Sequence, residues 1–299
     1  MKVIKRVTYK HIQNIFVKLM YKTSRIWPDN LYLRFMFFIK LGKFLHLKKP
    51  KSFNEKLQWL KLYDKNPLYT VLVDKVEVKE YVRKIIGDQY VIPTLGVWDR
   101  ASDIDFDNLP NQFVLKCNHD SGSISICLDK SSFNYSDAVN RLNVGLKSDY
   151  YFTGREWPYK HVNKRILAEK YLSPEDNTDL KDYKFFCFNG VVKFLKVDFD
   201  RHTNHKANYY DVNWNLLNFY ETDFPSDPSA VIHKPVSLIK MIELAEILSR
   251  GIPFIRIDFY EINERPYFGE MTFFPAAGFG KFSPGNADNE IGDMLNLFV

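Results

Sequence analysis

The sequence predicts an α+β fold of two subdomains, preceded by a basic helical extension. Two observations predict it: helix and strand patterns alternate irregularly along the chain, and a well-marked helix near residue 240 has strand runs on both sides. With 299 residues, 45% of them hydrophobic, the chain is long enough to bury a full core. Charge is unevenly distributed, which separates residues 1–51 from the rest.

Residues 1–51 form the first expected segment, a basic amphipathic extension. The first 50 residues contain 12 Lys or Arg and one acid, Asp29, which gives a net charge of +11. Apolar residues recur at helical spacing over 3–22 with lysines between them, which predicts a basic amphipathic helix. Two interpretations remain open: this helix packs on the protein's own core, or it lies on an anionic membrane surface.

The extension predicts neither a transmembrane helix nor a secretory signal. Its most apolar stretch, 31–47, contains Arg34, Lys40 and Lys43, which are costly in hydrocarbon. No apolar run with a small-residue cleavage site follows the basic start. The three cysteines lack the spacing of metal ligands, so we expect buried thiols. We expect a cytoplasmic protein, peripheral on the inner face of the membrane if residues 1–50 bind there, and no nucleic-acid partner.

Residues 52–165 form the second expected segment, the N-terminal subdomain. Ser52-Phe-Asn-Glu55 has capping-box spacing, which predicts the start of a helix. A further helix is predicted over 71–86. Two β-type runs, 113–117 and 124–128, flank a polar loop and predict a hairpin.

The tip of this hairpin has the composition of a phosphate-binding loop. Ser121, Gly122 and Ser123 are small, which would let backbone N–H groups approach phosphate oxygens. Lys116, near the end of the preceding run, would neutralise phosphate charge. An ordinary polar hairpin tip has a similar composition, and a single glycine does not distinguish the two.

Residues 166–299 form the third expected segment, the C-terminal subdomain. Two of its β-type runs, 183–188 and 191–197, are joined by Asn189-Gly190, a tight-turn signal that predicts antiparallel sheet. A helix is predicted over 236–250, with proline before it and glycine after it.

Two later β-type runs carry the residues that best define a chemistry. A period of two over 254–260 places Arg256 and Asp258 on one face. The apolar residues of this run share the other face: Ile255, Ile257 and Phe259. The same rule groups three residues of the second run: Phe268, Glu270 and Thr272.

A hairpin between the two runs would set their register. If residues 262–266 form the loop, three pairs follow: Glu261 with Tyr267, Asp258 with Glu270, and Arg256 with Thr272. Opposed carboxylates with Cβ atoms about 5 Å apart repel each other unless a cation lies between them. Mg²⁺, which also binds nucleotide phosphates, would supply that cation. The alternative is a solvated hairpin face on which both charges point into water.

Short phrases spread over most of the chain together resemble a known family. They are Ser52-Phe-Asn-Glu-Lys56, Asp74-Lys75, Val114-Leu-Lys116 with the Ser121-Gly-Ser123 loop, Ala168-Glu-Lys-Tyr-Leu172, Asp182-Tyr-Lys184, Phe188-Asn-Gly190, Arg256-Ile-Asp258 and Tyr267-Phe-Gly-Glu270. In content and order they resemble the ATP-grasp superfamily, and more closely its TupA-like branch, found in bacterial capsule and teichuronopeptide gene clusters. The resemblance implies an ATP-grasp fold, in which two α+β subdomains clasp ATP and Mg²⁺.

The resemblance also implies roles for residues of this chain. Lys75 and Lys116 would contact ATP phosphates, and the hairpin tip would close over them. Adenine, ribose and further cofactor contacts would come from Glu169, Lys170, Leu172, Asp182 and Lys184. Asp258 and Glu270 would hold Mg²⁺. Arg256 would stabilise negative charge on the transferred phosphoryl group and on the tetrahedral intermediate.

One position departs from the family pattern. Many ATP-grasp enzymes have Asn two residues beyond the second metal carboxylate, where this chain has Thr272, whose hydroxyl can still ligate a metal. The implied reaction transfers the γ-phosphoryl group of ATP to a carboxylate, and an amine then attacks the acyl phosphate to form an amide. In the family context, the substrates would be a sugar or glycan carboxylate, such as a uronic acid, and an amino acid of a surface polysaccharide.

Other functions fit parts of the sequence. Asp198-Phe-Asp200 and Asp103-Ile-Asp105 are D-x-D patterns of the kind that metal-dependent glycosyltransferases use, although such tripeptides are common by chance. An ATP-grasp kinase of a glycan or sugar would stop after phosphorylation, and the sequence does not show the acceptor. A non-catalytic protein with a relic nucleotide site is disfavoured, because the charged residues of all these motifs occur together.

Overall fold

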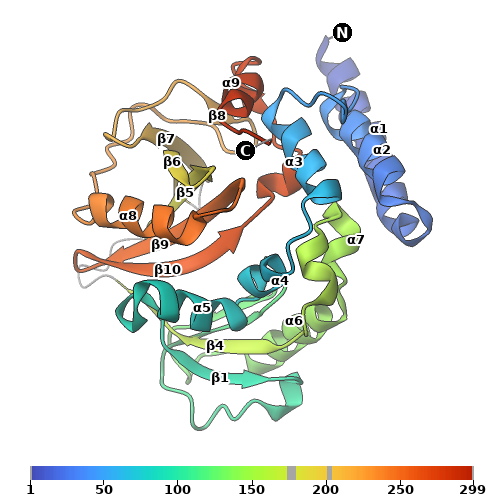
Figure 1. The fold of residues 1–299 in the computed structure, drawn as a ribbon. Helices are drawn as coiled ribbons and strands as arrows, with labels where there is room; N and C mark the ends of the chain where they lie inside the picture. Colours follow the sequence, from blue (N-terminus) through green and yellow to red (C-terminus); the bar gives the residue numbers. More distant parts are fainter. Residues whose placement is uncertain (1, 174–179, 201–203, 298–299) are drawn as a thin grey trace.

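Two antiparallel sheets form the body of the protein, and helices cover them (Figure 1). The computed structural model describes residues 2–173, 180–200 and 204–297. Its strands are β1 (Thr94–Trp98), β2 (Phe113–Cys117), β3 (Ile124–Cys127), β4 (Ile166–Lys170), β5 (Asp182–Phe188), β6 (Val191–Phe199), β7 (Lys206–Asp211), β8 (Tyr220–Glu221), β9 (Phe254–Ile262), β10 (Arg265–Thr272) and β11 (Phe282–Ser283). The small sheet has the order β1-β4-β2-β3 and the large sheet the order β10-β9-β5-β6-β7, while β11 pairs with β8.

Helices connect and cover the sheets. They are α1 (Lys2–Lys22), α2 (Asp29–Leu41), α3 (Phe53–Tyr63), α4 (Leu68–Val73), α5 (Glu77–Ile86), α6 (Tyr135–Lys147), α7 (Tyr150–Gly154), α8 (Leu238–Ser249) and α9 (Ala287–Asp293). Helix α6 packs on β2 and β3, whereas α8 packs on β5, β6 and β9. Within the described part of the chain, no helix is long and apolar enough to cross a membrane.

Two local predictions are confirmed. The side chain of Ser52 accepts a hydrogen bond from the backbone N–H of Glu55 (3.3 Å), and the Glu55 carboxylate accepts one from the N–H of Ser52 (3.2 Å). This capping box starts α3 at the predicted place. Asn189 and Gly190, both with positive φ, form the tight turn between β5 and β6.

The long helix predicted over 71–86 is wrong, because the chain breaks between α4 and α5. The Asp74 carboxylate accepts hydrogen bonds from the N–H groups of Val76 (2.8 Å) and Glu77 (3.4 Å), at the turn that precedes α5. At the break, the N–H of Lys75 donates to the carbonyl oxygen of Asn118 at 3.1 Å. The start of α5 is therefore tied to the β2–β3 hairpin.

Strand β4 belongs to the small sheet. Its fourth residue, Glu169, lies opposite Thr94 of β1 and Val114 of β2. Because hydrogen bonds join β4 to the strands of the expected N-terminal subdomain, we propose that the second boundary follows Lys170 instead of residue 165. The boundary between the extension and the body, at 51/52, stays a proposal.

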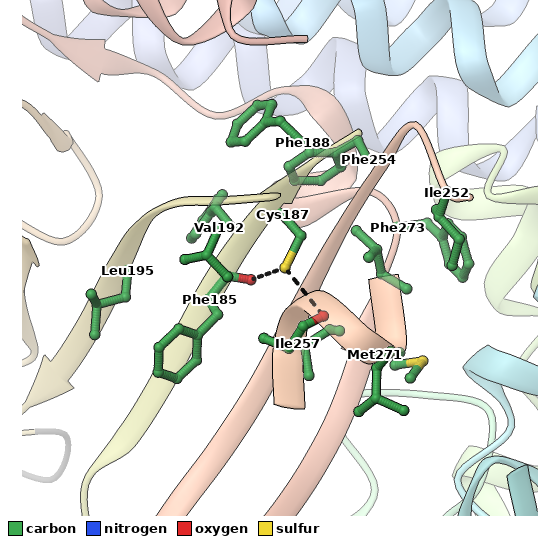
Figure 2. Close-up of a cluster of buried hydrophobic side chains, with 14 of the residues drawn as sticks. Phe185, Cys187, Phe188, Val192, Leu195, Ile252, Phe254, Ile257, Met271 and Phe273 are labelled. Carbon is green, nitrogen blue, oxygen red and sulfur yellow. Dashed lines mark hydrogen bonds between the residues drawn. The ribbon is translucent and has the colours of Figure 1, made fainter. Parts of the chain in front are cut away.

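The largest apolar core lies between the large sheet and the helices that cover it. Figure 2 shows part of it, where Cys187 lies among side chains of β5, β6, β9 and β10. Its thiol is 3.8 Å from the carbonyl oxygen of Phe185 and 3.9 Å from that of Ala245. Burial raises the pKa of Cys187 to about 12, so the thiol stays protonated. All three cysteines are free and buried, as expected.

Candidate nucleotide and metal site

The β9–β10 hairpin brings the two predicted metal ligands together. Asp258 lies directly opposite Glu270, and Arg256 opposite Thr272, as the sequence predicted. The predicted loop is wrong, however: the turn consists of Asn263 and Glu264 alone, both with positive φ. The strands therefore start one residue out of the predicted register, with Tyr267 opposite Tyr260 instead of Glu261.

A β-bulge at Gly269 restores the register before the site. The pairing shifts by one residue between Phe268 and Glu270, and the shift cancels the error in the loop. A Cβ atom at Gly269 would lie 3.1 Å from the carbonyl oxygen of Asp258, so a side chain there is tightly constrained. The bulge also changes which residues share a face. Phe268 packs against Phe259 in the apolar core, so its predicted grouping with Glu270 and Thr272 is wrong.

Arg256 lies between the two carboxylates. Its guanidinium donates to both oxygens of Asp258, at 2.7 and 2.6 Å, and to Glu270 at 3.0 Å. It also donates to the hydroxyl of Thr272 at 3.0 Å. The cation that keeps the carboxylates apart in this structure is therefore a guanidinium, a partner that the sequence argument did not consider.

The two carboxylates differ in environment. Asp258 is 1% exposed, and burial raises its pKa to about 6, although Arg256 and Lys184 oppose the rise. The Glu270 side chain is 36% exposed. Desolvation would raise its pKa, but the positive charges of Lys75 and Arg256 lower it overall. Glu270 is thus the ionised, more open side of the pair.

Polar residues of β5 and β6 continue this face of the large sheet. Lys184 lies opposite Asp258 and forms an ion pair with it at 3.4 Å. Its other ion-pair partners are Asp182, two residues before it on β5, and Asp198 of β6, at 3.3 Å. All four residues, Lys184, Asp258, Asp182 and Asp198, are buried, each less than 10% exposed. The fold therefore places Asp182 and Lys184 beside the carboxylate pair, although they are far apart from it in sequence.

Lysines connect this face to the small sheet. The Nζ atom of Lys75 donates to the carbonyl oxygen of Asp120 at 2.6 Å and lies 3.9 Å from the Glu270 carboxylate. Lys116 forms an ion pair with Glu169. Desolvation lowers the pKa of Lys75, and the nearby charge of Lys116 adds to this effect. Lys75 thus lies beside the carboxylate pair, and Lys116 is close enough to Lys75 to affect its pKa.

Sequence reasoning missed Lys79. Its Nζ atom is 2.5 Å from the Glu169 carboxylate and donates to the carbonyl oxygen of Ile92 at 2.7 Å. Glu169 therefore lies between two lysines, Lys79, which is buried, and Lys116, which is half-buried. A signal was available in the helical spacing of the sequence, because Lys79 comes four residues after Lys75. In the structure, Lys79 lies on the buried side of α5 with Val78 and Val82.

The remaining predicted residues lie on either side of this region. In the hairpin tip, Ser121 and Gly122 are exposed, whereas Ser123 is buried and donates to the Asp120 carboxylate. At the end of β4, Lys170 is exposed and Leu172 is half-buried. Within the ranges that the structure describes, Lys170 makes no ion pair or side-chain hydrogen bond.

The D-x-D patterns have different surroundings. Asp103 is in an exposed turn and bonds Arg100 at 2.9 Å. Asp198 is buried on the charged face of the large sheet, where its carboxylate is 2.9 Å from the ring of His205. Asp198 is thus already paired with cationic groups, and it belongs to the same charged surface as Asp258.

The α+β fold, with two antiparallel sheets covered by helices, is that of the ATP-grasp class. The sequence pattern of the family described as TupA-like ATP-grasp matches residues 55–296. The chain belongs to that family, and the predicted fold is confirmed.

Solved structures similar to this chain include D-alanine–D-alanine ligases. The ATP complex from Bacillus anthracis is 14% identical, with a TM-score of 0.42, and the alignment covers 75% of this chain and 63% of that one. The Helicobacter pylori enzyme is 14% identical, with a TM-score of 0.43 and coverages of 82% and 70%. A RimK domain ATP-grasp protein from Sphaerobacter thermophilus is 12% identical, with a TM-score of 0.41 and coverages of 76% and 69%. No curated protein sequence matches this chain.

Proposed function

We propose that this protein is an ATP-dependent ligase that joins a carboxylate to an amine through an acyl phosphate. The observation that carries the proposal is the placement of Asp258 opposite Glu270, with Arg256 between them and Lys75 on the open side. Opposed carboxylates beside lysines suit the binding of a metal–nucleotide complex. Family membership supports the nucleotide in this role.

The residues present fit Mg²⁺, with one rearrangement. Mg²⁺ prefers oxygen ligands and is usually bound by one or two carboxylates together with substrate phosphates. Asp258 and Glu270 supply such oxygens, and the hydroxyl of Thr272 is 3.4 Å from the Glu270 carboxylate. Asp258 and Glu270 would hold the ion, and Arg256, which contacts both carboxylates in this structure, would contact the phosphates instead. When bound, Mg²⁺ would neutralise charge on the transferred phosphoryl group.

The protein's own side chains position the nucleotide and the acceptor. Lys75 and Lys116 would bind the phosphates, covered by the backbone of 121–123. Further cofactor contacts would come from Glu169, Lys170, Leu172, Asp182 and Lys184. Arg256 would stabilise the negative charge that develops on the phosphoryl group and on the tetrahedral intermediate.

The proposed reaction has two steps. A substrate carboxylate oxygen attacks the γ-phosphorus of ATP, the bond to ADP breaks, and an acyl phosphate forms. The amine then attacks the acyl carbon, phosphate leaves, and the amine loses a proton as the amide forms. Holding both substrates in place accounts for most of the rate enhancement, because the protein supplies no covalent intermediate.

For the substrates we propose a sugar carboxylate, such as a uronic acid, and an amino acid, joined during assembly of a surface polysaccharide such as a capsule. The resemblance to TupA-like proteins supports this choice. So does the excess of 12 Lys or Arg over one acid in residues 1–50, which favours an acidic glycan or lipid carrier.

A substrate panel tests the proposed reaction. Purified protein is incubated with Mg-ATP and with uronic acids and amino acids, singly and in pairs, and ADP and phosphate are measured separately. We expect release of both only with a matched pair, with ¹⁸O passing from the labelled carboxylate to phosphate. ADP without phosphate, together with a phosphorylated sugar, would indicate a kinase. Turnover of a sugar nucleotide without ATP would contradict the ligase and favour a glycosyltransferase.

A further inference from the structure

Helices α1 and α2 carry apolar side chains that are largely exposed in the described part of the chain. On α1 these are Ile15, Phe16 and Leu19, and on α2 they are Phe35 and Phe38, followed in the chain by Phe44. They are 47% to 75% exposed. The rings of Phe38 and Phe44 stack with their centroids 5.2 Å apart. We call these six residues the N-terminal apolar face.

The helices themselves are fixed to the body of the protein. The opposite side of α2 is fully buried and contacts α3 and the segment before β11. Gln13 of α1 donates to the carbonyl oxygens of Ile39 (2.5 Å) and Lys40 (3.1 Å) of α2. Asp29, at the start of α2, pairs with Arg155 at 2.9 Å. Figure 1 shows both helices at the edge of the molecule, beside α3.

The packing of the extension on the core therefore accounts for one side of it only. One side packs on the core, whereas the N-terminal apolar face remains open. Exposed apolar side chains gathered on neighbouring helices mark a surface that another molecule can cover.

The positive charge around the N-terminal apolar face favours an anionic partner. Among residues 1–50 there are 12 Lys or Arg, and the one acid, Asp29, is bound to Arg155 and Tyr151. Lys18 and Lys22 of α1 and Lys43, Lys48 and Lys49 after α2 are exposed. A second copy of the chain would bring two such basic regions together, which is repulsive. An anionic bilayer offers apolar chains and negative headgroups at once.

We propose that the N-terminal apolar face docks the protein on the surface of an anionic membrane, with the phenylalanines in the headgroup–acyl boundary and the lysines among the headgroups. Neither helix spans the bilayer. The docked helices would hold the sheets next to the membrane, where lipid-linked intermediates are located. This proposal is independent of the reaction that the sheets perform.

Vesicle flotation tests it. The full chain is mixed with vesicles of phosphatidylcholine alone, or of phosphatidylcholine and phosphatidylglycerol in equal amounts. We expect binding to the anionic vesicles only, and weaker binding as salt is added. The variant Phe16→Ser/Phe38→Ser should bind about tenfold less tightly, because it removes two apolar anchors. The matched control is Val144→Ser/Ile239→Ser, at positions 71% and 77% exposed on α6 and α8, and it should bind like the wild type.

Other outcomes would overturn the proposal. They are absence of vesicle binding, equal binding to both vesicle types, or equal loss in the two variants. Sedimentation of the protein alone provides a further check. If the wild type fails to bind vesicles but self-associates, and Phe16→Ser/Phe38→Ser is monomeric, the face is an interface between copies. ATP-dependent turnover without lipid should be the same in all these variants, whichever outcome is found.

Discussion

Asp258→Asn and Glu270→Gln are each expected to reduce Mg²⁺-dependent ATP turnover by about a thousandfold. Each change keeps the size of the side chain but removes one of the two negative charges that face each other across β9 and β10. Loss of a metal ligand at a phosphoryl-transfer site costs about 4 kcal/mol of transition-state stabilisation, which corresponds to that factor. The measurement is the initial rate of ADP release at saturating ATP, with the Mg²⁺ concentration varied.

A matched control separates this effect from damage to the hairpin. Glu264→Gln removes a carboxylate from the exposed turn of the same hairpin and should leave the rate unchanged. Circular dichroism should show all three variants folded. Full activity in both Asp258→Asn and Glu270→Gln would refute the assignment of this pair as the metal site.

Glu169→Gln is expected to lower the free energy of unfolding by about 3 kcal/mol, since it leaves the buried Lys79 and the half-buried Lys116 without a countercharge. Lys79 and Lys116 both contact the Glu169 carboxylate, and the three side chains are 17% exposed or less. Urea unfolding at neutral pH measures the change. The control is Glu80→Gln, because Glu80 also bridges two cations, Arg83 and Lys84, but is 54% exposed. Its loss should hardly change the stability.

The pH dependence of this difference has a definite sign. Desolvation works against the charged form of Glu169, but Lys116 and Lys79 lower its pKa overall in the folded protein. Its contribution to stability is therefore present above the pKa of an unfolded Glu, about 4.3, and is lost as the pH falls towards the lower folded value. The stability gap between the wild type and Glu169→Gln should shrink in acid. A gap that stays constant down to the acid transition would contradict the ion-pair explanation.

The sequence predicted the carboxylate pair but not how the hairpin achieves it. Alternation along each strand places Asp258 opposite Glu270, and this pairing depends only on the net register. The predicted loop was longer than the observed two-residue turn, and the bulge at Gly269 compensated for the difference. A bulge has little sequence signal beyond a glycine within a strand, so the position of Phe268 could not be predicted from the period alone.

Long-range charge pairs were the main omission. The sequence alone does not distinguish Lys79 from an ordinary surface lysine. Its ion pair with Glu169 becomes apparent only when β4 is placed beside α5. The charged surface that Asp198 shares with Asp258 is not apparent until β5 is placed beside β9, which sets Lys184 opposite Asp258. Strand order decides both, and a single sequence gives no direct information on which strands are neighbours. In contrast, the capping box and the Asn189-Gly190 turn are local, and both were predicted correctly.

The central claim is that Asp258 and Glu270 hold the metal ion through which the nucleotide binds this sheet. The most direct test is equilibrium binding of a non-hydrolysable ATP analogue, by calorimetry, with Mg²⁺ or with EDTA. The account predicts binding that is about tenfold or more tighter with Mg²⁺, and the loss of this dependence in Asp258→Asn. Equal affinity with and without Mg²⁺ in the wild type, or binding of a sugar nucleotide in place of the ATP analogue, would contradict it.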